Sequence, residues 1–206
     1  MATPALSTTN ASALNNSALN KTPARSGTPA LVGTLCGVAG AAMFGAAITS
    51  SYLSVRNATG AAEFVPVEMP FNNYAAVMIA ATLVLASIAA GWAVTSMRVN
   101  DRRYASIGFG FAAFMGVAAL NMIWFLGVDA KLSVDTGAYT ALFYAMLAAA
   151  VIMVFIGMVS SLIGLARVLG GQATARQPHY ALASMWGQHA ALAVWLAIYA
   201  TLYWLK

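Results

Sequence analysis

The residues of this sequence best placed to do chemistry inside a membrane are Gln188 and His189. They stand side by side in an apolar run, residues 177–205, that carries no formal charge before Lys206. An ionisable side chain inside a membrane is costly and therefore marks a candidate functional site. Two interpretations of His189 stay open. It is either a neutral imidazole hydrogen-bonded to a neighbouring helix, with Asn121 as one partner, or a contact with lipid headgroups, water or another subunit.

No other set of side chains has the spacing of a catalytic or metal-binding site. The five acidic residues all lie outside the apolar runs, so neither a proton relay nor a carboxylate metal cage is predicted. His179 and His189 are too few to form a haem or metal centre without other donors. Cys36 is the single cysteine, which excludes an internal disulfide. We therefore expect no catalytic site, no metal and no cofactor in this chain.

The composition places the chain in a membrane. Of its 206 residues, 61% are hydrophobic and only 7% are charged, whereas soluble domains carry about 25% charged residues. The mean hydropathy of +0.78 agrees. The net charge of +5 does not indicate a nucleic-acid partner, because the basic residues are scattered and border apolar segments.

Five apolar runs are each long enough to cross a bilayer, which takes about 20 residues. The sequence thus predicts an all-α protein, a bundle of five transmembrane helices. Residues 1–29 form a polar tail without the apolar core of a secretory signal, and such a segment cannot bury enough surface to fold alone. The expected spans, within a transmembrane domain of residues 30–206, are 30–55, 72–97, 104–128, 136–168 and 178–205.

Charges in the connecting segments predict the orientation. With the N-terminus in the cytoplasm, seven basic residues face inward and three face outward, as the positive-inside rule requires. The C-terminus is then outside. The inward set is Lys21, Arg25, Arg98, Arg102, Arg103, Arg167 and Arg176, and the outward set is Arg56, Lys131 and Lys206.

Small residues at four-residue spacing predict where helices touch, because they let backbones approach closely. Such ridges are Gly33, Gly37, Ala41 and Gly45 on the first helix, Gly108, Ala112 and Gly116 on the third, and Gly157 with Ser161 and Ser160 with Gly164 on the fourth. On the last helix, Trp195, Tyr199, Tyr203 and Trp204 are expected near the outer interface, where amphipathic rings anchor helices.

The last run resembles the last helix of subunit III of haem–copper cytochrome c oxidases. That helix typically reads Trp-His-x-x-Asp-x-x-Trp with a Tyr near its end, and His189, Trp195 and Tyr203 match this spacing. Two further stretches are similar to the first and fourth helices of the five-helix form, so the resemblance covers about residues 33–206. They contain Gly33-Thr34, Met43-Phe44 and Tyr52-Leu53-Ser54-Val55-Arg56 in the first run, and Ala138-Tyr139, Phe143-Tyr144 and Arg167 in the fourth.

The chain departs from this family at most of its polar signature, and we identify it as a divergent member. The membrane Glu of the first helix falls on Ala41, and the last-helix Asp falls on Leu192. The Trp before the His falls on Gln188. The Thr-Gly-x-His-x-x-His signature falls on Leu147, Ala148, Ala150 and Met153.

The resemblance implies a non-catalytic, structural and lipid-binding subunit of an aerobic terminal oxidase in a bacterial plasma membrane. Such a subunit supports oxygen reduction by catalytic subunit I of a proton-pumping complex. Its expected partners are subunit I, the other oxidase subunits and bound phospholipid, and haem and copper are expected in the partner subunits. Lipid or subunit contacts are expected at Tyr52, Arg56, Arg167, His189 and Trp195.

Two other functions stay open. One is a small-solute transporter or channel subunit, although such proteins usually show internal repeats and helices broken by Gly or Pro. Here every Pro lies outside the cores of the five spans, with Pro70 and Pro178 at their edges. The other is an accessory subunit of a different membrane oxidoreductase, such as nitric oxide reductase.

Overall fold

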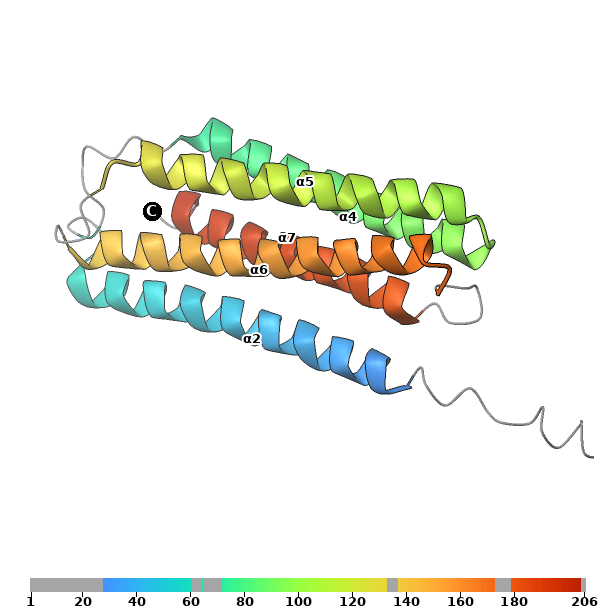
Figure 1. Ribbon diagram of the computed structural model, residues 1–206. Coiled ribbons are helices and arrows are strands. Elements are labelled where there is room, and N and C mark those ends of the chain that lie inside the picture. The colour runs from blue at the N-terminus through green and yellow to red at the C-terminus, as the bar shows by residue number, and fades with distance from the viewer. Residues whose placement is uncertain (1–27, 61–63, 65–71, 133–136, 173–178, 205–206) are drawn as a thin grey trace, which may run out of the picture.

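The protein is an all-α, multi-pass membrane protein. The computed structural model describes residues 28–60, 64, 72–132, 137–172 and 179–204. Across these ranges it has no strand, and each of its five helices is long and apolar enough to cross a bilayer. The helices begin and end within four residues of the predicted spans, and the first starts inside the segment expected as tail (Figure 1). They are α2 (Thr28–Thr59), α4 (Asn73–Arg98), α5 (Arg102–Asp129), α6 (Ala138–Leu169) and α7 (His179–Tyr203).

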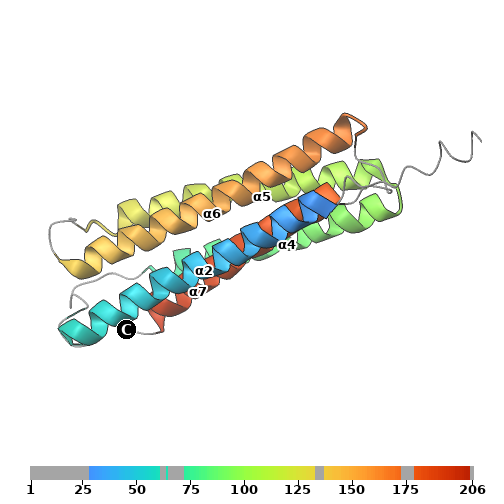
Figure 2. The ribbon, with the colours of Figure 1, turned by 90° about the horizontal axis from the view of Figure 1, so that it is seen from below.

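Four of the helices form a closed group and the fifth lies outside it. α4 packs on α5, α5 on α6, α6 on α7 and α7 on α4, while α2 packs mainly against α7 and only slightly against α6. Figure 2 shows α2 lying along α7, and Figure 1 shows it diverging from α6 toward its N-terminus. Only 11% of the most apolar stretch of α2 is buried, against 44% for α4, α6 and α7. The helix α7 is therefore the centre of the molecule.

The two ends of the bundle differ in chemistry. At one end, which we call the basic end, lie the C-termini of α4 and α6 and the N-terminus of α5, with Arg98, Arg102, Arg103 and Arg167. The α4–α5 turn places Asn100 in the left-handed region, at φ 61°. Asp101 then caps α5 by accepting a hydrogen bond from the Tyr104 amide at 3.3 Å. The charged groups thus gather where a helix ends rather than within the apolar stretches.

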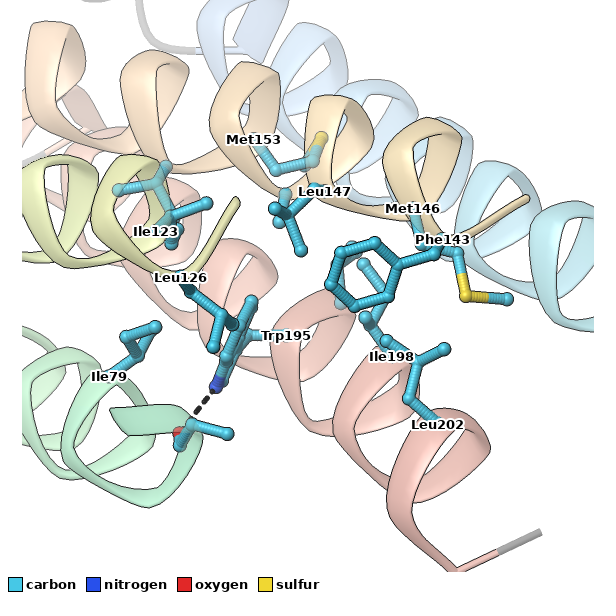
Figure 3. Packing of buried hydrophobic residues seen from close by; sticks show 14 of the residues in the cluster. Ile79, Ile123, Leu126, Phe143, Met146, Leu147, Met153, Trp195, Ile198 and Leu202 are labelled. Atoms are coloured by element: carbon cyan, nitrogen blue, oxygen red, sulfur yellow. Dashed lines mark hydrogen bonds between the residues drawn. The ribbon is translucent and has the colours of Figure 1, made fainter. Parts of the chain in front are cut away.

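The largest cluster of buried residues lies between α4, α5, α6 and α7, with Ala41 and Tyr52 of α2 beside it, toward the end opposite the basic end. Figure 3 shows part of this cluster. Trp195 of α7 is only 2% exposed and donates from Nε1 to the Ala76 carbonyl oxygen of α4 at 3.3 Å. Trp195 thus lies at the level of Ala76, three residues after α4 begins and so near one end of the bundle, but its ring is a core contact between two helices and not an anchor at the membrane surface. Its fully buried neighbours include Ile79, Ile123, Met146 and Ile198.

Small residues make the closest helix contacts on α5 and α6, as predicted. An added Cβ at Gly108 would stand 2.8 Å from the Ala93 Cβ, and one at Gly116 would stand 3.0 Å from the Met158 Cβ. The predicted ridge on α2 is only half used within the chain. Ala41 is buried and Gly45 meets Val194 of α7. Among the described residues, an added Cβ at Gly33 or Gly37 would meet nothing within 4 Å, so neither glycine packs on another of the five helices.

Candidate functional site

A cluster of uncharged polar side chains lies where α6 crosses α7. We call Ser161, Ser184 and Gln188 the amide–serine cluster; all three are at most 1% exposed. Gln188 donates from Nε2 to the Ser161 hydroxyl at 2.9 Å and to the Gly157 carbonyl at 3.1 Å. Ser184 adds a hydroxyl contact to Ser161 at 3.3 Å. The cluster therefore fastens α7 to α6 by side-chain hydrogen bonds.

The cluster also depends on glycine. Gln188 Oε1 is buried without a hydrogen-bond partner among the described residues, and it faces the position where a Cβ of Gly157 would stand, at 3.3 Å. An added Cβ at Gly187 would stand 2.8 Å from the Ser160 hydroxyl. Gly157 and Gly187 thus let the two backbones meet at this crossing. All of these groups are neutral, so the cluster holds helices together and supplies no acid or base.

The depth of this cluster follows from helix geometry. Ser87 of α4 donates to the Gln188 carbonyl at 3.4 Å and lies eleven residues before Arg98 at the basic end. At about 1.5 Å per residue, that separation is about 16 Å. The apolar core of a bilayer is about 30 Å thick. Gln188 and its neighbour His189 therefore lie near the middle of the apolar layer.

His189 takes the opposite side of α7 from the core. It is exposed, and its Nδ1 lies 2.8 Å from the Met185 carbonyl oxygen of the same helix. The Trp186 ring lies 6.3 Å from the imidazole, between centroids. The interpretation with Asn121 as partner was wrong, because Asn121 is exposed on α5, which packs against α4 and α6. The polar residue turned inward is Gln188, not His189.

Tyr52 belongs to an aromatic cluster at the end opposite the basic end. Its ring is fully buried and meets the rings of Phe64 and Tyr139 edge-on, at 5.3 and 6.3 Å between centroids. Phe64 and Tyr139 lie 5.4 Å apart in the same way. Arg56, one turn further along α2, is half-buried beside them. This cluster ties the end of α2 to the start of α6.

Asn72, which the sequence analysis missed, joins three helices at the same end. Its side chain caps α4 by accepting from the Ala75 amide at 3.0 Å, and it donates to Asp129 of α5 at 3.2 Å. Its carbonyl accepts a hydrogen bond from the Tyr203 hydroxyl of α7 at 3.4 Å. An Asn directly before a long apolar run is a helix-capping signal, and it could have been used to find this residue.

The residues expected to contact lipid or other subunits do not form one site. Tyr52 and Arg56 lie at one end of the bundle, Arg167 lies half-buried in the last turn of α6 at the other, and His189 is exposed near mid-depth. Trp195 is in the core. Arg56, Arg167 and His189 therefore lie in three separate places, and Tyr52 and Trp195 are buried packing contacts.

Apolar grooves run along both sides of α2. The first, about 630 Å³, lies between α2 and α7 and is lined by small residues that include Gly45, Ala46, Ala193 and Ala197. The second, about 470 Å³, lies between α2, α6 and α7 and is lined by Gly37, Gly40, Phe44 and Ile156 among others. Both have the apolar walls and depth that suit an acyl chain or a neighbouring helix.

Nowhere in the described part of the chain do three or more His, Cys, Asp or Glu side chains come together as a metal site would need. The sequence matches no protein-family model and none of the curated proteins with which it was compared. The function is therefore inferred from the geometry of the bundle and from the sequence resemblance in three of its helices.

Proposed function

We propose that this chain is a non-catalytic, subunit III-like component of an aerobic respiratory terminal oxidase. It lies in a bacterial plasma membrane with its N-terminus and its basic end in the cytoplasm, because Arg98, Arg102, Arg103 and Arg167 share that end. Haem and copper belong to the partner subunits, with catalytic subunit I as the main partner.

The observation that carries this proposal is the position of the residues on which the resemblance rests. Among them Tyr52, Tyr139, Phe143 and Trp195, from three separate stretches of sequence, lie in one buried cluster, and Tyr203 packs against it. The matching residues Met43, Phe44 and His189 lie at exposed positions outside it. A chance match in sequence spacing would not require the matching residues of α2, α6 and α7 to pack together. Their convergence supports the view that the frame of the subunit III fold is retained.

The positions at which the family carries acidic and histidine side chains support a structural role. Ala41 and Leu147 are buried, and they stand where the family has a membrane Glu and the start of its histidine signature. Leu192, in place of the family Asp, is partly buried on α7. These positions hold no carboxylate that could take part in proton uptake, so support of the complex and lipid binding are the functions we propose.

Phospholipid fits the groove between α2 and α6. This groove is apolar, and Gly37 and Gly40 leave open space beside it. An acyl chain needs only apolar contact, which the walls supply through Phe44, Ile152 and Ile156. Lipid held there would fill the space that α2 leaves where it diverges from α6.

The proposal is tested by deleting the chain and following oxygen consumption by the membranes. A supporting subunit should leave the initial rate of oxygen consumption in place and shorten the time over which that rate is sustained, and the wild-type chain should restore the duration. Oxygen consumption with unchanged rate and duration in the deletion strain would contradict the proposal.

A further inference from the structure

One side of α7 is left open by the rest of the bundle. Trp186, His189, Ala193 and Leu196 recur at three- and four-residue spacing and therefore lie on one side of the helix. All four are exposed, and we call them the His189 face. The other sides of α7 pack against α2, α4 and α6.

The imidazole on this face has an unused acceptor. A carbonyl oxygen can only accept, so the 2.8 Å contact with Met185 requires that His189 Nδ1 carries the proton. In the neutral imidazole Nε2 is then an acceptor. No side chain or backbone group among the described residues donates to it.

Lipid cannot supply the missing donor at this depth. His189 lies next to Gln188, about 16 Å from the level of Arg98 and so near the middle of the apolar layer. An imidazole is too short to reach the headgroups from there. Acyl chains carry no hydrogen-bond donor, and water is scarce in this layer.

The surface beside His189 suits a second helix. Ala193, one turn after His189, also lines the groove of about 630 Å³ between α2 and α7. Gly45 and Ala46 of α2 and Ala197 of α7 line the same groove. Small residues allow two helices to approach closely, and polar side chains form hydrogen bonds between the helices. Both features promote helix association in membranes.

We infer that the His189 face and the adjoining α2–α7 groove dock a membrane-spanning helix of a different chain. That helix presents a hydroxyl, amide or indole donor to His189 Nε2 at mid-membrane depth. A second copy that set His189 against His189 across a two-fold axis fits less well, because two Nε2 acceptors would then face each other without a proton between them. The inference needs only a partner helix and stands independently of the oxidase assignment.

Photocross-linking in native membranes tests this docking surface. The full-length chain carries a benzophenone amino acid in place of Leu196, which is 44% exposed on the His189 face. The matched control carries it in place of Phe114 on α5, which is exposed. Phe114 lies at a similar depth, because its near neighbour Gly116 packs on Met158 of α6, and Met158 adjoins Gly157, which contacts Gln188. We expect the Leu196 probe to form one adduct, mapped by mass spectrometry to a membrane-spanning segment of another polypeptide. The Phe114 probe should not label that segment.

Substitution of His189 separates its hydrogen bond from simple packing. His189→Leu should raise the dissociation constant of the adduct-forming complex about threefold, the factor for an average interhelical hydrogen bond in a membrane. His189→Gln, which keeps an acceptor, should leave that constant near the wild-type value. An adduct containing a second copy, labelling of lipid alone, or an equal response to His189→Leu and His189→Gln would each overturn the inference.

Discussion

Gln188 of α7 donates its side-chain amide to the Ser161 hydroxyl of α6 at 2.9 Å, within a crossing that Gly157 and Gly187 keep close. Its neighbour in sequence, His189, faces a different side of α7 and is exposed. Successive residues on a helix are about 100° apart, so adjacent polar side chains serve different surfaces. The inward amide joins α7 to α6, and the outward imidazole lies on the surface for which we propose a partner helix.

Gln188→Leu should therefore destabilise the folded chain. The change removes the donor to Ser161 and Gly157, and we expect a loss of about 1 kcal/mol in the free energy of unfolding, within the range for interhelical hydrogen bonds in membranes. Unfolding in mixed micelles with increasing denaturing detergent measures the loss. Asn121→Leu is the matched control, because Asn121 is exposed on α5 and should be replaced without loss. Equal stability of the Gln188→Leu variant and the wild type would contradict this role.

Gly108→Ala should be more harmful than Gly37→Ala. The new methyl group at position 108 would stand 2.8 Å from the Ala93 Cβ and 3.0 Å from the Ala89 carbonyl oxygen, so α4 and α5 would have to move apart. Overpacking of this kind costs about 1–3 kcal/mol. At position 37 the methyl group meets nothing within 4 Å, and we expect no loss. The same detergent unfolding assay compares the two variants. A larger loss in the free energy of unfolding for Gly37→Ala than for Gly108→Ala would contradict the contacts described for α2.

Trp195→Ala should be among the most damaging single changes. It removes a ring that is 2% exposed and a hydrogen bond to Ala76, and replacing a buried aromatic side chain by Ala costs about 3–5 kcal/mol. Trp124, which is 73% exposed on α5, provides the matched control. Thermal unfolding followed by circular dichroism should show a large decrease in the midpoint for Trp195→Ala and a small one for Trp124→Ala. Similar decreases would mean that Trp195 faces lipid after all.

The orientation can be read by cysteine labelling, because Cys36 is the only native cysteine. In a Cys36→Ala background, Gln172→Cys lies at the basic end and Ala58→Cys at the other, and both positions are exposed. A membrane-impermeant maleimide applied to intact cells should label only Ala58→Cys, because basic residues are retained in the cytoplasm. Labelling of Gln172→Cys in intact cells would reverse the topology.

Hydropathy and length were enough to predict the five helices, because each apolar run must satisfy its own backbone hydrogen bonds inside a membrane. Small-residue spacing predicted the contacts of Gly108 and Gly116 correctly, whereas Gly33 and Gly37 meet no other described helix of this chain. The spacing shows that a close approach is possible and does not say that a neighbouring helix is present. At the N-terminal half of α2 the neighbouring helix diverges.

The rotation of α7 could not be predicted from the sequence. Its residues are apolar on nearly every side, so no pattern distinguished Trp195 in the core from Trp186 on the surface. The same ambiguity hid the inward turn of Gln188 and left the partner of His189 open. Only the packing of three helices around α7 fixes which side is buried.

We propose that this chain is part of a terminal oxidase and carries none of its redox centres. Purifying the tagged chain from native membranes in mild detergent tests this proposal. A reduced-minus-oxidised absorption spectrum and metal analysis are then recorded on the purified material, and its subunits are identified by mass spectrometry. We expect a-type haem and copper in amounts equimolar with the chain, carried by a co-purifying catalytic subunit. A chain that purifies intact with no haem, or with b-type haem and non-haem iron in place of copper, would contradict it.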